Sequence, residues 1–269
     1  MPLLIKTSKN CESIHQKMTT SYRITASTGR HKGDRDYQQD QVSLLSHHRM
    51  PECMLGIVAD GMGGRSGGRK ASDQVMLTAK QLFDRYSPDT DDGPSMLRQI
   101  VEEAHIVIKL TAISSEQEPH STLAAFLISP NGECHWVHTG DSRIYHFHGS
   151  KLVHRTTDHS YVQSLVDSGK ITEEEANNHP QSNILMGCLG AEEPPPIAQH
   201  YIAKLRPNDV LMGCSDGVWH YFNASEMGSA LSMLSPREAT EFLIQKACKR
   251  ARSVGDNLAL VIVKFEALD

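Results

Sequence analysis

The chain has 269 residues, of which 39% are hydrophobic, and no Pro-, Ser- or Gly-rich linker divides it, so we expect one domain with a sizeable core. Its formal charge is −5, from 27 basic and 32 acidic residues, and the absence of a basic stripe argues against a nucleic-acid partner. No apolar stretch approaches the length of a membrane span, and the first residues are too briefly apolar for a signal peptide, so we expect a cytoplasmic protein with no membrane partner. The six cysteines form no C-x-x-C pair, and we expect them to be free thiols.

The first residues of the chain carry little structural signal. Residues 1–20 show no hydrophobic periodicity, and we expect them to form a loose leader of unknown purpose ahead of a domain that spans 21–269. Within that domain the first chemical signal is Asp40, which opens the apolar segment 42–45.

The most informative stretch follows. The apolar run 53–59 predicts a strand, Asp60 stands at its end, and the glycine-rich tract 61–68 comes directly after it. A carboxylate on a rigid strand end beside bare backbone can contact a metal ion or an anion. An Asp-Gly pair is also an ordinary turn signal, so this stretch alone does not identify a metal site.

Helical and strand patterns come in separate runs in the middle of the chain. Apolar residues recur at helical spacing over 71–86 and over 97–108, which predicts two helices side by side on a sheet. Strands of an antiparallel meander are expected at 122–128, 134–139 and 143–147.

The C-terminal part continues this separation. The segment 160–190 is expected to form short helices broken by turns, with few large apolar groups. A capping box with proline in the first turn predicts a helix that begins at Ser235, and an apolar strand is expected at 258–265. Runs of strands and separate runs of helices indicate an α+β layered fold.

Five aspartates stand at the ends of predicted strands, although they are scattered along most of the chain. They are Asp40, Asp60, Asp141, Asp216 and Asp256. Repelling carboxylates gathered at one end of a fold are unfavourable unless cations neutralise them. The repetition therefore favours a site for divalent metal ions.

The aspartates belong to a set of short motifs that follow one another in a definite order along the chain. The set is Arg35 with Asp40, Asp60-Gly61-Met62-Gly63-Gly64, Ser121-Thr122, Gly140-Asp141-Ser142-Arg143, Asp158-His159-Ser160, Ser215-Asp216-Gly217 and Asp256-Asn257. This order resembles the metal-dependent protein serine/threonine phosphatases of type 2C, in their bacterial form, from about Ser21 to Phe265. The resemblance implies a four-layer sandwich of two antiparallel sheets flanked by helices, and hydrolysis of phosphoserine and phosphothreonine in proteins by a metal-activated water.

The resemblance also implies roles for individual residues. Asp60 would bridge two metal ions, with the carbonyl of Gly61 as a further ligand; Asp216 and Asp256 would hold the second ion. Asp40 would reach metal directly or through water, Asp141 would help to hold a third, weaker ion, and Arg35 would bind the phosphate. Ligation by oxygen alone favours Mn²⁺ or Mg²⁺ over zinc. Asp141 has an alternative interpretation as a hydrogen-bonding turn residue, and Arg143 is expected to be a structural ion-pair partner.

The chain departs from the family pattern at two positions. Gln39 stands where many relatives have a carboxylate, and Met62 stands where animal members have a histidine general acid. A thioether carries no transferable proton. Histidines in the predicted strands, His138 and His146 among them, are expected at surface positions, and His159 is expected to be structural.

Other functions remain open from the sequence. One is a regulatory module of the same fold that binds phosphoproteins and is catalytically weak; another is a different metal-dependent hydrolase, such as a phosphodiesterase. The phosphatase interpretation implies a signalling role, with phosphorylated proteins as substrates and an opposing serine/threonine kinase. The sequence does not predict the oligomeric state.

Overall fold

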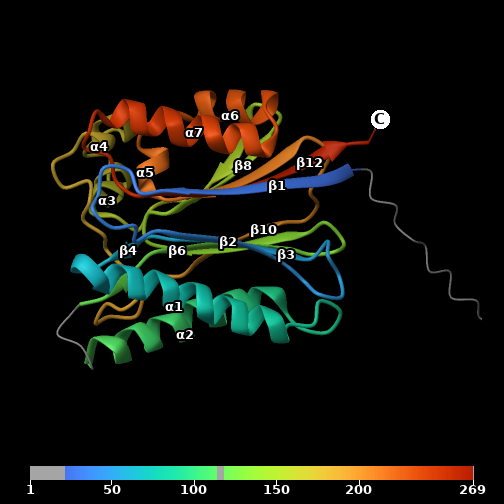
Figure 1. Ribbon diagram of the computed structural model, residues 1–269, viewed down its shortest axis with the longest axis horizontal. Coiled ribbons are helices and arrows are strands. Elements are labelled where there is room, and N and C mark those ends of the chain that lie inside the picture. The colour runs from blue at the N-terminus through green and yellow to red at the C-terminus, as the bar shows by residue number, and fades with distance from the viewer. Residues whose placement is uncertain (1–21, 114–117, 269) are drawn as a thin grey trace, which may run out of the picture.

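The chain forms a sandwich of four layers. The computed structural model describes residues 22–113 and 118–268, and two antiparallel five-stranded sheets lie face to face in it. A pair of helices covers the outer side of each sheet (Figure 1). The α+β sandwich expected from the sequence is confirmed, whereas the leader expected over 1–20 lies outside the described residues.

Both sheets bring together strands from distant parts of the sequence. The first sheet contains, in spatial order, β1 (Tyr22–His31), β12 (Leu258–Ala267), β11 (Asp209–Cys214), β8 (Arg143–His148) and β9 (Lys151–Arg155). The second contains β10 (Ala198–Ile202), β7 (Cys134–Thr139), β6 (Leu123–Ile128), β3 (Met54–Ala59) and β2 (Gln41–Ser46). A short ribbon pairs β4 (Gly61–Met62) with β5 (His120–Ser121). The predicted meander is confirmed only for β6 and β7, which pair antiparallel. It is wrong for the third strand, because the chain crosses to the other sheet after β7 and β8 pairs there with β11 and β9.

The two helices on the second sheet extend beyond the ranges predicted from periodicity, whereas α6 (Ala224–Met233) on the first sheet was not predicted. The helices on the second sheet are α1 (Gly64–Arg85) and α2 (Gly93–Ile113), and those on the first are α6 and α7 (Pro236–Ala251). α1 therefore begins inside the glycine-rich tract, where Gly63 precedes it with φ 122°. Glycine adopts this angle without a Cβ clash. The capping box of α7 is present, since Ser235 accepts from the Glu238 N–H.

Three apolar layers stabilise the sandwich, one under each helix pair and one between the sheets. β3 is apolar throughout because both of its faces are buried. Leu55 and Ile57 face α1 and α2, while Met54 and Val58 face the other sheet. A strand that is buried on both faces has no polar side to alternate with.

Short helices gather at one end of the sandwich. They are α3 (Tyr161–Asp167), α4 (Glu173–Asn177) and α5 (Asp216–Trp219), and they lie at the left in Figure 1, near β4. The first two belong to the 160–190 segment and confirm its predicted short helices. In the described part of the chain, no helix combines the length and the apolar character needed to cross a membrane.

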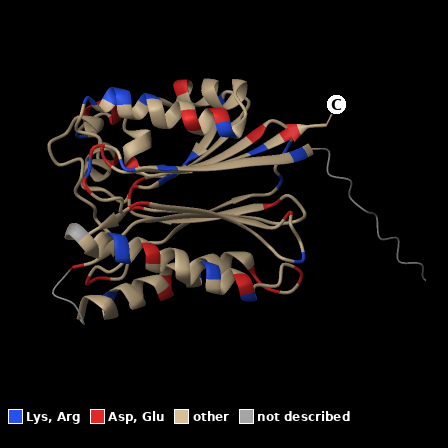
Figure 2. Cartoon of the chain, in the orientation of Figure 1, with Lys and Arg blue, Asp and Glu red and all other residues tan. Residues whose placement is uncertain are grey.

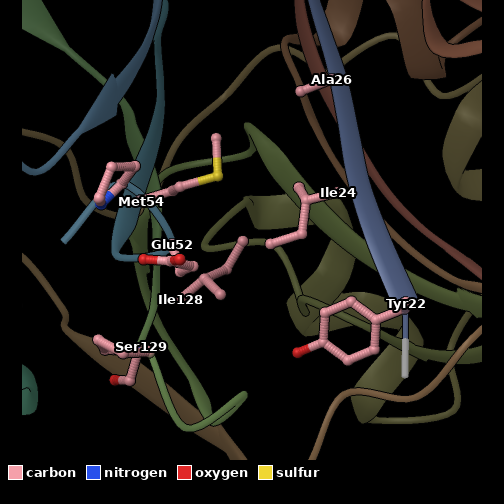
Figure 3. A pocket seen from close by; sticks show the side chains of 9 residues that line it. Tyr22, Ile24, Ala26, Glu52, Met54, Ile128 and Ser129 are labelled. Atoms are coloured by element: carbon pink, nitrogen blue, oxygen red, sulfur yellow. The ribbon is translucent and has the colours of Figure 1, made fainter. Parts of the chain in front are cut away.

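A cavity of about 290 Å³ lies at the opposite end of the sandwich. Tyr22, Ile24, Met54 and Ile128 contribute to its wall, and it is largely apolar (Figure 3). None of the five strand-end aspartates lines it. This cavity therefore does not belong to the candidate site.

Candidate metal and phosphate site

The five strand-end aspartates meet at the end of the sandwich that carries α3, α4 and α5. Asp60 follows β3 and Asp40 precedes β2 in one sheet, while Asp216 follows β11 and Asp256 precedes β12 in the other. Asp141 lies between β7 and β8, which belong to different sheets. Figure 2 shows acidic residues in the loops at this end. The layered fold thus gathers carboxylates that are remote in sequence.

Burial and mutual repulsion raise the pKa values of four of these carboxylates, Asp40, Asp60, Asp141 and Asp216. Burial, followed by the charges of Asp40 and Asp216, raises the pKa of Asp60 well above its ordinary value. Burial also raises the pKa of Asp40 to about 8, against the hydrogen bond from Ser215, and that of Asp216 to about 6. Burial and the charge of Asp216 raise the pKa of Asp141. A group of acids that resists ionisation in this way is suited to cations, which displace the protons.

The donor set fits hard divalent cations. Asp60 is hydrogen-bonded to both Asp40 and Asp216, so these oxygens are already within one another's reach. Among the described residues, no three acidic, histidine or cysteine side chains already surround a point at ligand distances. Ion binding therefore requires the carboxyl groups to lose protons and to rearrange. Oxygen donors of this kind suit Mn²⁺ and Mg²⁺.

A small pocket opens beside the carboxylates. Its volume is about 170 Å³, and its wall includes Asp141, Asp216 and Asp256 together with Ser182 and Asn183 of the 160–190 segment. The predicted segment beside the site therefore does reach it. The contribution of Ser182 and Asn183 was not predicted from the sequence, because neither belongs to a recognisable motif.

Hydroxyl groups fix the backbone of Asp60. Its N–H donates to Thr122 Oγ1 at 3.0 Å, and its carbonyl oxygen accepts from the Thr122 N–H at 2.9 Å and from Ser121 Oγ at 3.1 Å. Thr122 Oγ1 is also 2.7 Å from Ser142 Oγ, next to Asp141. The Ser121-Thr122 motif thus holds the end of β3 rigidly and connects it to the β7–β8 turn.

Glycines let the backbone next to Asp60 pack closely against α1. The carbonyl oxygen of Gly61 lies directly against Gly68, and a Cβ at position 68 would collide with it. A glycine at 68 therefore keeps a side chain from displacing this oxygen, which is the backbone group that would serve as a ligand. Gly68 had no assigned role in the sequence, because the close approach of α1 to β4 is a tertiary feature.

Asn257 fixes the loop that carries Arg35 and Asp40. Its Oδ1 accepts from the Gln39 N–H at 2.6 Å, and its Nδ2 donates to the carbonyl oxygens of Lys32 and Tyr37 at 2.8 and 2.9 Å. One amide side chain thus satisfies three backbone groups of a loop that is distant in sequence. This role was missed, since an Asp-Asn pair before a strand carries no such information.

Arg35 lies at the exposed rim of the site. Its Nη2 is 2.5 Å from Asp256 Oδ2, and the two side chains are 61% and 39% exposed. The hydrogen bond and charge of Asp256 raise the pKa of Arg35. A planar, permanently charged guanidinium at this rim is able to grip two phosphoryl oxygens.

The two departures from the family pattern have structural consequences. The amide of Gln39 donates to the carbonyl oxygen of Gly64 at 2.6 Å, so it joins a loop to α1 and adds no negative charge to the site. Met62 lies opposite His120 in the β4–β5 ribbon. A histidine is thus close to the position that the family pattern assigns to the acid, although it comes from another segment.

Arg143 forms a buried ion pair, in line with the structural role expected for it. Its Nε and Nη2 donate to the two oxygens of Asp158 at 2.8 and 2.7 Å, and the side chains are only 11% and 6% exposed. The Cζ atom lies 3.4 Å from the ring centroid of Trp219. This cluster lies against the 160–190 segment, because Val162 and Ala176 of that segment line the same small cavity.

Asp158→Asn should therefore destabilise the protein by about 3–5 kcal/mol, since it leaves a buried guanidinium without a counter-charge. Urea unfolding measures the effect. Glu102→Gln is the matched control, because it removes the charge from the exposed Arg98–Glu102 pair and should change stability by no more than about 0.5 kcal/mol. Equal effects of the two variants would contradict a buried, stabilising pair.

The prediction that the strand histidines are at the surface is wrong for His138 and His146, which are 3% and 7% exposed. Each histidine lies two residues after a member of the apolar layer between the sheets, Trp136 on β7 and Ile144 on β8, and therefore faces the same layer. The opposite faces of β7 and β8 are covered by helices, so neither strand has a solvent-exposed side.

His138 stacks on His159 with centroids 4.7 Å apart, and His159 Nδ1 accepts from the Gly140 N–H at 3.2 Å. Burial and the charge of His138 lower the pKa of His159 to about 4. The neutral ring packs behind the turn that carries Asp141.

Comparison with known proteins connects this site to a family. The family model described as "Protein phosphatase 2C" matches residues 29–259. The serine/threonine protein phosphatase PstP of Mycobacterium tuberculosis is 31% identical over 210 residues, which cover 76% of this chain but only 39% of that protein. The serine/threonine phosphatase stp of Listeria welshimeri is 32% identical over 219 residues, which cover 77% of this chain and 83% of that protein.

Solved structures agree with the sequence comparisons. The crystal structure of M. tuberculosis PstP/Ppp has a TM-score of 0.78 and 29% identity over 90% of this chain and 99% of that chain. The catalytic domain of PstP in complex with two manganese ions has a TM-score of 0.74 and 27% identity over 90% of this chain and 98% of that chain. Because the family match covers residues 29–259, which are most of the chain, this chain belongs to the protein phosphatase 2C family.

Proposed function

We propose that this chain is a metal-dependent protein serine/threonine phosphatase that hydrolyses phosphoserine and phosphothreonine in proteins. The observation that carries the proposal is the convergence of Asp40, Asp60, Asp141, Asp216 and Asp256 at one end of the sandwich, beside an exposed arginine. The relatives that the chain resembles are named serine/threonine phosphatases. The chain spans less than half of the mycobacterial relative, so the proposal concerns the part that the two share.

The carboxylates would hold two metal ions tightly. Asp60 would bridge them, with the Gly61 carbonyl on one ion and with Asp216 and Asp256 on the other; Asp40 would complete the set. Asp141 would hold a third, weaker ion together with Asp216. Manganese is supported by the PstP catalytic domain with two such ions, and magnesium by the oxygen-only donor set. When bound, such ions supply charge neutralisation and an activated water.

Residues at the rim would orient the substrate. Arg35 is paired with Asp256, and neutralisation of that carboxylate would free the guanidinium for the phosphate. Ser182 and Asn183 line the pocket from the 160–190 segment, which would act as a flap over the phosphorylated peptide. The domain that performs this chemistry would span 21–269, with 160–190 as its flap.

Substrates would be phosphorylated proteins, and a serine/threonine kinase would oppose the enzyme in signalling. A cytoplasmic location is supported by the cysteines, since those in the described residues are all unpaired. The thiols of Cys53, Cys134 and Cys214 are buried, which raises their pKa. Buried neutral thiols of this kind are usual in reducing compartments.

Hydrolysis of synthetic peptides tests the proposed function. Purified protein with Mn²⁺ should release phosphate from phosphoserine and phosphothreonine peptides, and excess chelator should stop the release reversibly. Peptide binding without turnover, under conditions in which the metal is bound, would instead support the regulatory module. A preference for bis-p-nitrophenyl phosphate over the monoester peptides would support a phosphodiesterase.

Arg35→Ala should raise KM for a phosphoserine peptide more than it lowers kcat, because the guanidinium grips the phosphate in both the ground state and the transition state. Because the side chain of Arg35 is exposed, the variant should remain folded. Arg35→Lys should recover part of the loss, since lysine offers charge without paired planar donors. An unchanged KM in Arg35→Ala would exclude phosphate binding by this residue.

A further inference from the structure

Trp219 connects two segments that carry carboxylates. Its indole Nε1–H donates a hydrogen bond of 2.9 Å to the backbone carbonyl oxygen of Asp141. Trp219 is also the last residue of α5, whose first residue is Asp216. Trp219 as a whole residue is 9% exposed, so water does not compete well for this bond. One side chain thus connects the Asp141 backbone directly to the helix of Asp216.

The indole is itself held in place by a buried cation. The guanidinium of Arg143 lies 3.4 Å from the ring centroid, and the bidentate bond to Asp158 fixes the orientation of its plane. A guanidinium stacks favourably on an indole face. The indole therefore has little freedom to rotate away from Asp141.

Trp219 also forms a wall shared by two cavities. On one side is the pocket lined by Asp141 and Asp216, and on the other is a small polar cavity of about 40 Å³ lined by Arg143 and Asp158. The Nε1–H is the only polar group of the side chain, and it is already bonded to Asp141. Trp219 therefore has no free polar group with which to bind or react with a substrate. Its contribution is to hold the backbone of Asp141 in position.

We propose that Trp219 is a positioning residue that sets the affinity of the weaker metal ion held between Asp141 and Asp216, and that the Arg143–Asp158 pair supports it in this role. The inference rests on the proposed function. Asp141 follows Gly140, which has a φ of 93°, in a turn between strands of different sheets, so its backbone depends on tertiary contacts. Asp60, by contrast, is fixed by Ser121 and Thr122, and the tightly held ions do not depend on the indole.

Trp219→Phe tests the proposal, because it keeps an aromatic ring but removes the donor. Manganese bound to the resting protein is counted by electron paramagnetic resonance as Mn²⁺ is titrated. The number of tight ions should stay unchanged, and the Kd of the weaker ion should rise about fivefold, the value for loss of one ordinary hydrogen bond. Arg143→Lys should raise the same Kd, since lysine cannot hold the flat bidentate geometry.

Trp136→Phe is the matched control. Trp136 is the other tryptophan of the chain, and it lies in the apolar layer between the sheets, so this variant should leave both classes of manganese binding unchanged. Asp141→Ala should weaken the weaker ion more than Trp219→Phe does.

Three outcomes would overturn the proposal. They are an unchanged weaker Kd in Trp219→Phe, loss of the tight ions in that variant, or an unchanged weaker Kd in Asp141→Ala. Hydrolysis of phosphoserine peptide by the wild-type protein is measured on the same preparation. If that hydrolysis remains metal-dependent, the failure concerns Trp219 or the weaker ion, and the proposed function stands.

Discussion

Asp60→Asn should abolish hydrolysis of phosphoserine peptides while the protein stays folded. The carboxyl group is hydrogen-bonded to Asp40 and Asp216, and in the proposed site its negative charge would bridge the two metal ions. Loss of about 4 kcal/mol of transition-state stabilisation corresponds to a fall in kcat of about 10³-fold. The amide has nearly the same shape as the protonated carboxyl group, can donate to both neighbours and never ionises inside the protein, whereas the pKa of Asp60 is raised by burial and neighbouring charges. The metal-free fold should therefore be at least as stable.

The measurements are initial rates, bound manganese and urea unfolding of the metal-free protein. Asp84→Asn is the matched control, because it makes the same change at an exposed helical ion pair with Lys80 and should leave turnover unchanged. Near-normal turnover in Asp60→Asn, at equal protein concentration and with metal present, would remove Asp60 from the reaction. An unfolded variant would show that the carboxylate has a structural role instead.

The metal-free protein should become less stable as the pH rises through the weakly alkaline range. The pKa of Asp40 in the folded protein is raised to about 8, chiefly by burial, whereas in the unfolded chain an aspartate is ionised above about pH 5. Between about pH 7 and pH 9 the folded state therefore binds the additional proton, and the stabilisation due to that proton is lost as the pH rises through the folded pKa. The expected loss is about 1 kcal/mol over this range.

Asp40→Asn is the control that isolates this effect. Histidines and cysteines also titrate, but the difference in free energy of unfolding between wild type and Asp40→Asn cancels their contribution. This difference should change by about 1 kcal/mol between about pH 7 and pH 9 in chelator. Saturating Mn²⁺ should remove the change, because bound cations replace the proton. A difference that is constant with pH would mean that Asp40 is ionised throughout in the folded protein.

The sequence was sufficient to place the five aspartates next to strands, because each stands near the beginning or end of an apolar run and such runs are visible in the order of the residues. The helix of 235–251 was also predictable, since its capping box is a local signal. The start of α1 at Gly64 could not be predicted from the sequence. Gly64 has poor helix propensity, and it is helical because α1 packs against the β4–β5 ribbon, which is a tertiary effect.

The burial of the histidines and the long-range hydrogen bonds of the supporting side chains also could not be predicted from the sequence. In a strand covered on both faces, the alternation of side chains does not distinguish an exposed side, so His138 and His146 could not be recognised as buried. The hydrogen bonds of Asn257 and Trp219 join residues that are far apart in sequence. Such contacts depend on the three-dimensional arrangement, and no local pattern encodes them.

The most direct test of the carboxylate cluster as a catalytic metal site is a titration of metal-stripped protein with Mn²⁺. Bound manganese is counted while hydrolysis of a phosphoserine peptide is followed in the same samples. Turnover should be absent from the metal-free protein and should rise as the second ion binds to each chain. Turnover by the metal-free protein, or two bound ions without turnover, would contradict this account.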